Sequence, residues 1–231
     1  MKKFTPWLIA LLVIAALGFW LYKGVTKPLP GEAVKEADGS DLSREHVTDI
    51  ADVVYSSNPP AGGKHFPVWA KPGVYDRFIS DGYFLHSMEH GYIIISYDCT
   101  KSISNSQFLI SNVLAHGDEA VTDSTASAKP LMHMTAQVAA GTSWITPENQ
   151  PPVEVELPDS FKTDSCKALV NQLSEFTKVA QRIIVTPRQG METPIAITAW
   201  ARILKLQNVD SEAIKNFINA FHNRGPEATM E

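Results

Sequence analysis

The stretch FLHSMEHGYIIISYD, residues 84–98, joins a histidine-rich motif to the most strand-like segment of the chain. Its second half, residues 91–98, is rich in β-branched and aromatic side chains, which are typical of a buried strand. RIIVTP (182–187) and PIAITAWARILKL (194–206) have the same character, and each is bounded by a proline. These three segments predict a β-sheet that contains residues 91–98.

Two amphipathic helices are predicted from the spacing of apolar residues. Over residues 166–180, apolar side chains recur at the intervals that place them on one helical face. A second helix is predicted within residues 210–225, where Asp210 or Ser211 can cap its start. Strands interleaved with two helices indicate an α+β domain, with a mixed or antiparallel sheet and both helices packed on it.

The N-terminal region carries a long apolar run, residues 4–22, without a charged residue. About 20 such residues can cross a bilayer as a helix, so we predict a transmembrane anchor here, with a cleaved signal peptide as the alternative. Lys2 and Lys3 favour a cytoplasmic end at residues 1–3. The prediction is a single-pass protein of the inner (cytoplasmic) membrane, with its main domain outside the cytoplasm.

The rest of the chain divides into a linker and one domain. Residues 23–42 mix proline, glycine and charge without periodicity, as linkers do. Residues 43–231 then form the extracytoplasmic α+β domain, with a poorly patterned insertion at about residues 101–160. Cys99 and Cys166 are the only cysteines, and an oxidising compartment would let them form a disulfide. Two buried, reduced thiols are the alternative.

Composition excludes some classes of function. The net charge is -5, and no basic stripe is present, so we expect no nucleic-acid partner. Phosphate-binding glycine loops and the Gly-x-Ser-x-Gly nucleophile motif are both absent from the sequence. A protein partner in the membrane or the periplasm fits the predicted topology.

The motif at the start of the quoted stretch predicts a metal site. Spacing of four residues would place His86 and His90 on one face of a helix, and neutral imidazole is a good ligand for zinc or copper. Glu89 could be a ligand, an acceptor that orients a ring, or a base. Met88 would favour copper if it faced the same way, but on a helix it would point to the other side.

The order His86-x-x-Glu89-His90 also matches the His-x-x-Glu-His motif of inverted zinc peptidases, in which Glu89 would act as the base. In those enzymes the motif lies within a helix. Here Gly91 and a strand follow at once, so any helix would be short and end at His90. Catalysis is therefore less favoured than binding, and we predict no other catalytic residue.

The other histidines are separated by their surroundings. His46 and His222 are predicted to be surface or packing residues, and His116 to lie in an exposed turn. The sequence Met132-His133-Met134 has the composition of a copper-handling segment, although alternation could simply bury both methionines. The role of this segment stays open.

Four separated segments, in order, resemble the bacterial family catalogued as domain of unknown function 3105. They are YSSNPPAGGKHFPVWAKPGVYD (55–76), LHSMEHGYIIISYD (85–98), RIIVTPRQGMETPIAITAWARILKL (182–206) and FHNRGPE (221–227). The resemblance implies an N-terminal membrane segment, but no reaction. The motif positions of the family map onto Asn58, Pro59, Pro60, His65, Trp69, Tyr75, His86, Glu89, His90, Trp200 and Glu227.

Grouping His65 with His86 and His90 rests on this resemblance. The leading hypothesis is a membrane-anchored protein that binds copper or zinc through these three residues, with Glu89, Met88 or Met191 as further ligands. Copper is slightly favoured because of the methionines. The alternatives are a non-metal interaction or assembly module and, third, a metal-dependent hydrolase.

Overall fold

The structure is a computed structural model that describes residues 5–25, 28–101, 143–151 and 155–227. It consists of two compact units, Met1–Pro30 and Gly31–Glu231. Within the described residues it is a mixed α+β protein with a six-stranded sheet and four α-helices. The predicted insertion at about residues 101–160, including Met132-His133-Met134, lies largely outside the described part of the chain.

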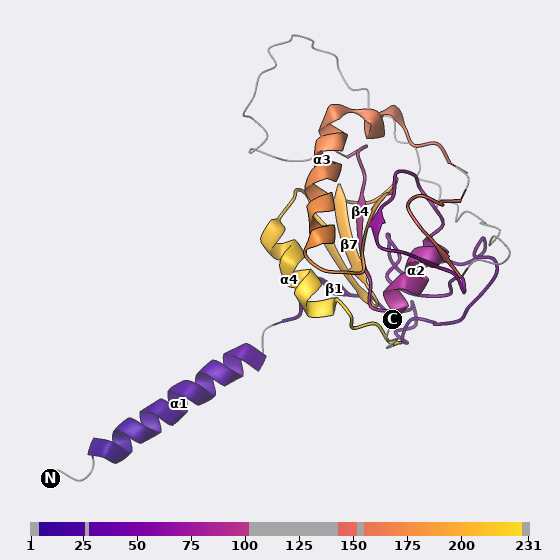
Figure 1. Cartoon of the computed structure of the whole chain (residues 1–231). Coiled ribbons are helices and arrows are strands. Elements are labelled where there is room, and N and C mark those ends of the chain that lie inside the picture. Colours follow the sequence, from indigo (N-terminus) through magenta and orange to yellow (C-terminus); the bar gives the residue numbers. More distant parts are fainter. Residues whose placement is uncertain (1–4, 26–27, 102–142, 152–154, 228–231) are drawn as a thin grey trace, which may run out of the picture. The chain divides into compact units, whose positions relative to one another are not determined.

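The N-terminal unit contains α1, Thr5–Val25, the indigo helix in Figure 1. In the part of the chain that is described, no helix combines the length and the apolar character needed to span a membrane. This finding corrects the predicted fold class with its transmembrane anchor at residues 4–22, and the predicted single-pass inner-membrane localisation.

The main sheet has the strand order β1-β8-β7-β4-β6-β3. The β4–β6 and β3–β6 pairs are parallel, and the remaining neighbours are antiparallel. The strands are β1 (Glu32–Ala33), β3 (Gly73–Val74), β4 (Ile93–Tyr97), β6 (Ile183–Pro187), β7 (Ile195–Ala199) and β8 (Arg202–Leu206).

The strand predicted from residues 91–98 is the central β4, and all five of its residues are buried. The continuous run 194–206 is a hairpin, because β7 ends at Ala199 and β8 begins at Arg202. Between them, Ala201 has φ 59°, a turn conformation that the sequence did not reveal. Strand β1 lies inside the predicted linker 23–42 and pairs with β8, so part of that segment belongs to the sheet.

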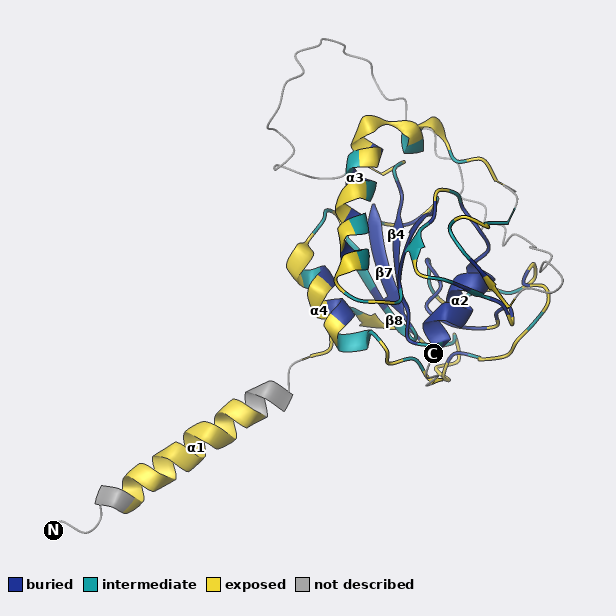
Figure 2. Cartoon of the chain, in the orientation of Figure 1, coloured by how far each residue is buried: buried dark blue, intermediate teal, exposed yellow. Residues whose placement is uncertain are grey.

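The helices of the second unit lie on opposite faces of this sheet (Figure 1). Helix α2 (Asp81–Glu89) packs on one face, where its side chains meet Ile94 and Ile184. Helices α3 (Asp164–Ser174) and α4 (Ser211–Phe221) cover the other face. The buried residues in Figure 2 fall along the sheet and along α2. Both α3 and α4 were predicted from their apolar spacing, including Asp210 as the cap of α4.

Two smaller features complete the α2 side. Strands β2 (Trp69–Ala70) and β5 (Trp144–Ile145) form a short parallel pair. His46 and His65 form an isolated parallel bridge, in which Val47 N donates to His65 O (2.7 Å) and His65 N donates to Glu45 O (3.0 Å). On the other side of the sheet, the predicted disulfide between Cys99 and Cys166 is present, with the Cα atoms 5.7 Å apart.

Candidate metal centre

Helix α2 presents the histidine motif. Its N-cap is Ser80, whose hydroxyl accepts a hydrogen bond from Gly82 N (3.4 Å), and every residue from Asp81 to Glu89 is buried. His90 is the C-cap, and Gly91 with φ 82° ends the helix in the left-handed conformation that favours glycine. As predicted, the helix is short and ends at His90. His86 and Glu89 nevertheless lie within its last turn, so the motif does not merely precede a strand.

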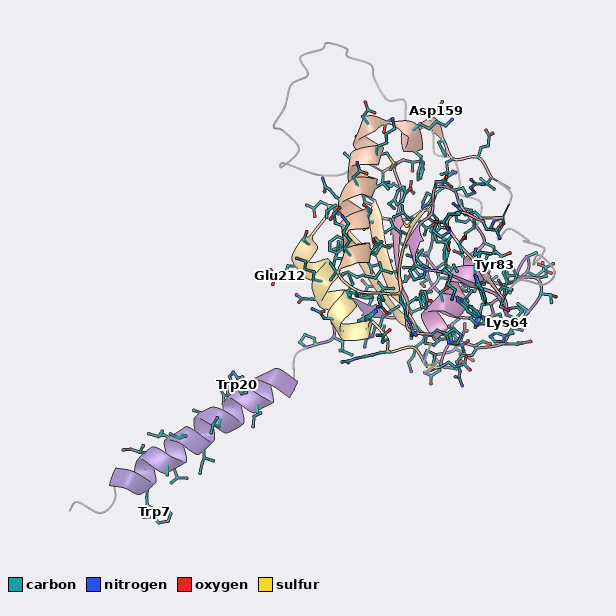
Figure 3. The ribbon with its side chains drawn as sticks, viewed as in Figure 1. Trp7, Trp20, Lys64, Tyr83, Asp159 and Glu212 are labelled. Carbon is teal, nitrogen blue, oxygen red and sulfur yellow. A yellow bond between two sulfur atoms is a disulfide. The ribbon has the colours of Figure 1, made fainter. Side chains whose placement is uncertain are left out.

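Three imidazoles converge beside this helix. Each of His46, His65 and His86 has one ring nitrogen within 4.8 Å of the others, and among the described residues they form the group that could hold a metal ion. His86 comes from α2, and His65 from the segment that follows the glycine pair at residues 62–63. His46 is held next to His65 by the isolated bridge. Lys64, labelled in Figure 3, precedes His65 on the α2 side of the sheet.

Backbone carbonyls orient the two buried rings. His65 Nδ1 lies 2.8 Å from Gly63 O, and His86 Nδ1 lies 2.7 Å from Phe66 O. A carbonyl only accepts, so each Nδ1 must carry the proton that it donates. In the neutral ring, Nε2 then keeps its lone pair, as a metal ligand requires.

Burial keeps both rings uncharged. It lowers the pKa of His86 to about 4, with the hydrogen bond from Nδ1 to Phe66 O acting in the opposite direction. Burial also lowers the pKa of His65, opposed by its contacts with Gly63 and Glu89. Desolvation disfavours the charged imidazolium in each case. Near neutral pH the site therefore offers two neutral, oriented imidazoles.

A carboxyl group completes the cluster. Glu89 is buried, and its Oε2 lies 3.0 Å from His65 Nε2 and 3.5 Å from His46 Nε2. Arg44, which is half exposed, reaches the other oxygen at 4.0 Å. When His65 donates from Nδ1 and is neutral, its Nε2 lone pair faces this carboxyl oxygen. Two acceptors at that distance require a proton or a metal cation between them.

Metal binding needs a small movement of one ring. Zn–N bonds of about 2.0 Å place two ligand atoms of a tetrahedral site roughly 3.3 Å apart. The ring nitrogens of this group lie within 4.8 Å of one another, so they must come closer together to share an ion. His46 lies parallel to His86, with 4.8 Å between ring centroids. Its side chain is 44% exposed, whereas those of His65 and His86 are buried. His46 is therefore the ligand that is free to turn.

His90, the third ligand of the predicted His65–His86–His90 site, and the further ligands Met88 and Met191 lie outside the converging group. The ring centroid of His90 is 4.8 Å from that of His86, but His90 is not part of the converging group. Met88 lies in the apolar cluster beneath the helix. Met191 is buried, and its backbone nitrogen donates to Asp98 Oδ2 (3.1 Å). A ligand role for these three residues stays a prediction.

His46 is the member that sequence reasoning missed. It was interpreted as a surface or packing residue, since no motif surrounds it and its contact with His65 is a single long-range bridge. Nothing in the local pattern indicates that register. Aromatic side chains enclose the cluster: Trp69 stacks near His86 at 5.7 Å, and Trp200 meets His65 edge-on at 5.8 Å.

The second unit is thus a mixed α+β domain with a histidine cluster at the end of a buried helix. The chain matches the family model described as "Protein of unknown function (DUF3105)" over residues 46–146 and 160–231, and it belongs to this family. The match confirms the resemblance seen in the sequence, and it begins at His46. No curated protein and no solved structure matches the chain.

Proposed function

We propose that this protein binds one divalent transition-metal ion through His46, His65 and His86, with Glu89 as the fourth ligand. The observation that carries the proposal is the convergence of three imidazoles within 4.8 Å, two of them buried. Buried polar side chains cost free energy unless they are paired, and a cation would satisfy the ring nitrogens and the carboxylate together.

The orientation of the rings supports the same proposal. Metal-binding histidines usually donate their second ring N–H to a carbonyl or carboxylate, which fixes the tautomer. His65 and His86 both do so, to Gly63 O and Phe66 O. Such an arrangement is expected of a metal ligand, and it also pairs the N–H group of each buried ring.

The ligand set favours zinc over copper. Three imidazoles and a carboxylate suit Zn²⁺ in tetrahedral geometry. A preference for Cu⁺ would need a thioether, and Met88 is directed into the apolar cluster below α2. With Glu89 as fourth ligand the site is closed, whereas a catalytic zinc keeps one position for water. We therefore propose metal binding rather than hydrolysis.

The test is metal titration of the full chain. After removal of metal by a chelator, we expect the protein to bind about one equivalent of Zn²⁺ and to give the intense visible bands of four-coordinate Co²⁺. His46→Ala should abolish the Co²⁺ bands, and since His46 is the exposed ligand, this change should leave the fold intact.

Lys178→Ala is the control, because Lys178 is exposed, pairs with Glu175 Oε1 (2.7 Å) and is not part of the cluster. It should bind metal as the wild type does. Binding below about a tenth of an equivalent, or binding unchanged in His46→Ala, would overturn the proposal. The non-metal interaction module would then be the better explanation.

A further inference from the structure

The last residues of the described chain contact the end of α2. Glu227 N donates to Glu89 O (3.1 Å), and Asn223 N donates to Gly91 O (2.9 Å). His90 O, which lies between these two acceptors, accepts from the Arg182 guanidinium (2.9 Å). The carbonyls at the C-terminal end of α2 thus accept hydrogen bonds from residues about 90 or more positions away in the sequence.

The two backbones are in direct contact at a pair of glycines. A Cβ on Gly225 would overlap Glu89 O and Gly91 N, so only glycine fits at this approach. A Cβ on Gly91 would lie 2.7 Å from Asn223 Cα, and Gly91 also has φ 82°. No side chain separates the site helix from residues 222–227, which we call the C-terminal segment.

Helix α4 holds the C-terminal segment in place. Phe217 and Ile218 of α4 are buried in the core on the far face of the sheet. Immediately after the helix, His222 Nε2 lies 2.6 Å from Gln181 O, next to the arginine that binds His90 O. The C-terminal segment therefore links the core packing of α4 to the end of α2.

The last carbonyls of a helix have no partner within the helix, and when they are unpaired the final turn frays. Glu89 is the last helical residue, and His86 lies one turn before it. Fixing Glu89 O fixes the backbone from which the Glu89 carboxylate reaches His65. A displacement there would separate the carboxyl oxygen from Nε2, which now lies 3.0 Å away.

We propose that the C-terminal segment is a positioning element of the metal centre: through the Glu227 N–H it holds Glu89 in the geometry that binds the ion. This inference rests on the proposed metal-binding function. If docking of the C-terminal segment strengthens metal binding, metal binding must stabilise the docked segment by the same factor, because the two equilibria are coupled. Metal bound at the cluster must therefore protect the Glu227 amide from hydrogen exchange.

The decisive comparison is Glu227→Pro against Glu227→Ala in the full chain. Proline lacks the N–H that binds Glu89 O, whereas alanine keeps it and removes only the exposed side chain. We expect Glu227→Pro to weaken Zn²⁺ binding about tenfold, the effect of roughly one hydrogen bond, and Glu227→Ala to bind as the wild type does. Equal affinity in both variants would overturn the inference.

Hydrogen exchange supplies a readout that does not depend on a variant folding. In the wild type, Zn²⁺ should slow exchange at the amides of Asn223 and Glu227, and exchange at Lys167 on α3 should stay unchanged. Slowing confined to residues near the histidines would contradict the coupling.

The two proposals fail in different ways. If the wild type binds no Zn²⁺, the metal-binding function is wrong. The positioning role can still be tested in the metal-free protein, where Glu227→Pro should speed exchange at residues 90–92 and Glu227→Ala should not. Unchanged exchange in Glu227→Pro would refute the role of the segment independently of metal.

Discussion

The two faces of the six-stranded sheet are built from different chemistry. The face under α3 and α4 is a continuous apolar cluster, joined by the disulfide to the end of β4. The face under α2 buries polar and ionisable groups among its apolar residues. They include His65, Ser80, Asp81, His86, Ser87, Glu89 and Arg188.

Every one of these buried polar groups needs a partner, since an unpaired one costs free energy. Ser87 Oγ, for example, bonds to the backbone of Ala70 and Tyr83. The α3–α4 face therefore contributes stability through buried apolar area and a disulfide. The α2 face contributes less stability, because it buries the polar groups that hold the histidine cluster in place. Four measurements test this difference between the two faces.

The largest effect is expected at the ion pair that holds the start of α2. The Arg188 guanidinium bonds to the Asp81 carboxylate and to Asn58 Oδ1 (2.9 Å), and Arg188 and Asp81 are both buried. Arg188→Met leaves the carboxylate without its cation and should reduce the free energy of unfolding by roughly 3–5 kcal/mol in urea denaturation. The double variant with Asp81→Leu should recover part of this loss, and no recovery would show that the pair itself is not the cause.

On the opposite face, removal of the disulfide should cost nearly as much. Cys99 and Cys166 are 67 residues apart in the sequence, and closing a loop of that length destabilises the unfolded chain by about 4.4 kcal/mol. Urea unfolding of the double serine variant measures the loss. Zn²⁺ affinity should be unchanged at a concentration of urea where the variant is folded. A fall in affinity would show that the two faces are not independent.

Acidification should destabilise the α2 face of the metal-free protein. Burial lowers the folded-state pKa of His86 to about 4, below its unfolded value near 6.5. Between these values the unfolded chain binds more protons, so stability is full above about pH 6.5 and falls as the pH drops toward 4, by up to about 3 kcal/mol. Urea midpoints measured against pH test this, and the slope should be shallower in His86→Gln.

The smallest effect on metal-free stability is expected at His46. Because its ring is half exposed, His46→Ala should change the free energy of unfolding by less than about 0.5 kcal/mol. In the wild type, Zn²⁺ at a hundred times its dissociation constant should add about 2.7 kcal/mol, and this gain should vanish in the variant. A large loss without metal would mean that His46 is structural.

The apolar face could be predicted from the sequence. The continuous apolar runs of β4 and β6 indicate strands buried on both faces, and the spacing of Ile214, Phe217 and Ile218 on α4 has the period of a helix. Each pattern states which residues are buried without reference to the rest of the chain.

The polar face could be predicted only in part. His86 and Glu89 were visible as a motif, because they lie in one helical turn. Strands of two residues such as β2 have no period to detect, and the bridge between His46 and His65 depends on how two loops meet. Such a site forms only when segments that are remote in sequence come into contact. The local spacing of residues does not predict these contacts.

The bond between Cys99 and Cys166 closes residues 99–166 into a covalent ring. A single proteolytic cut anywhere within that ring would yield two polypeptides that remain joined by the disulfide. They would run as one band on a gel without reductant and as two bands with it. The ring therefore makes the main domain tolerant of a cleavage that would divide an uncrosslinked chain.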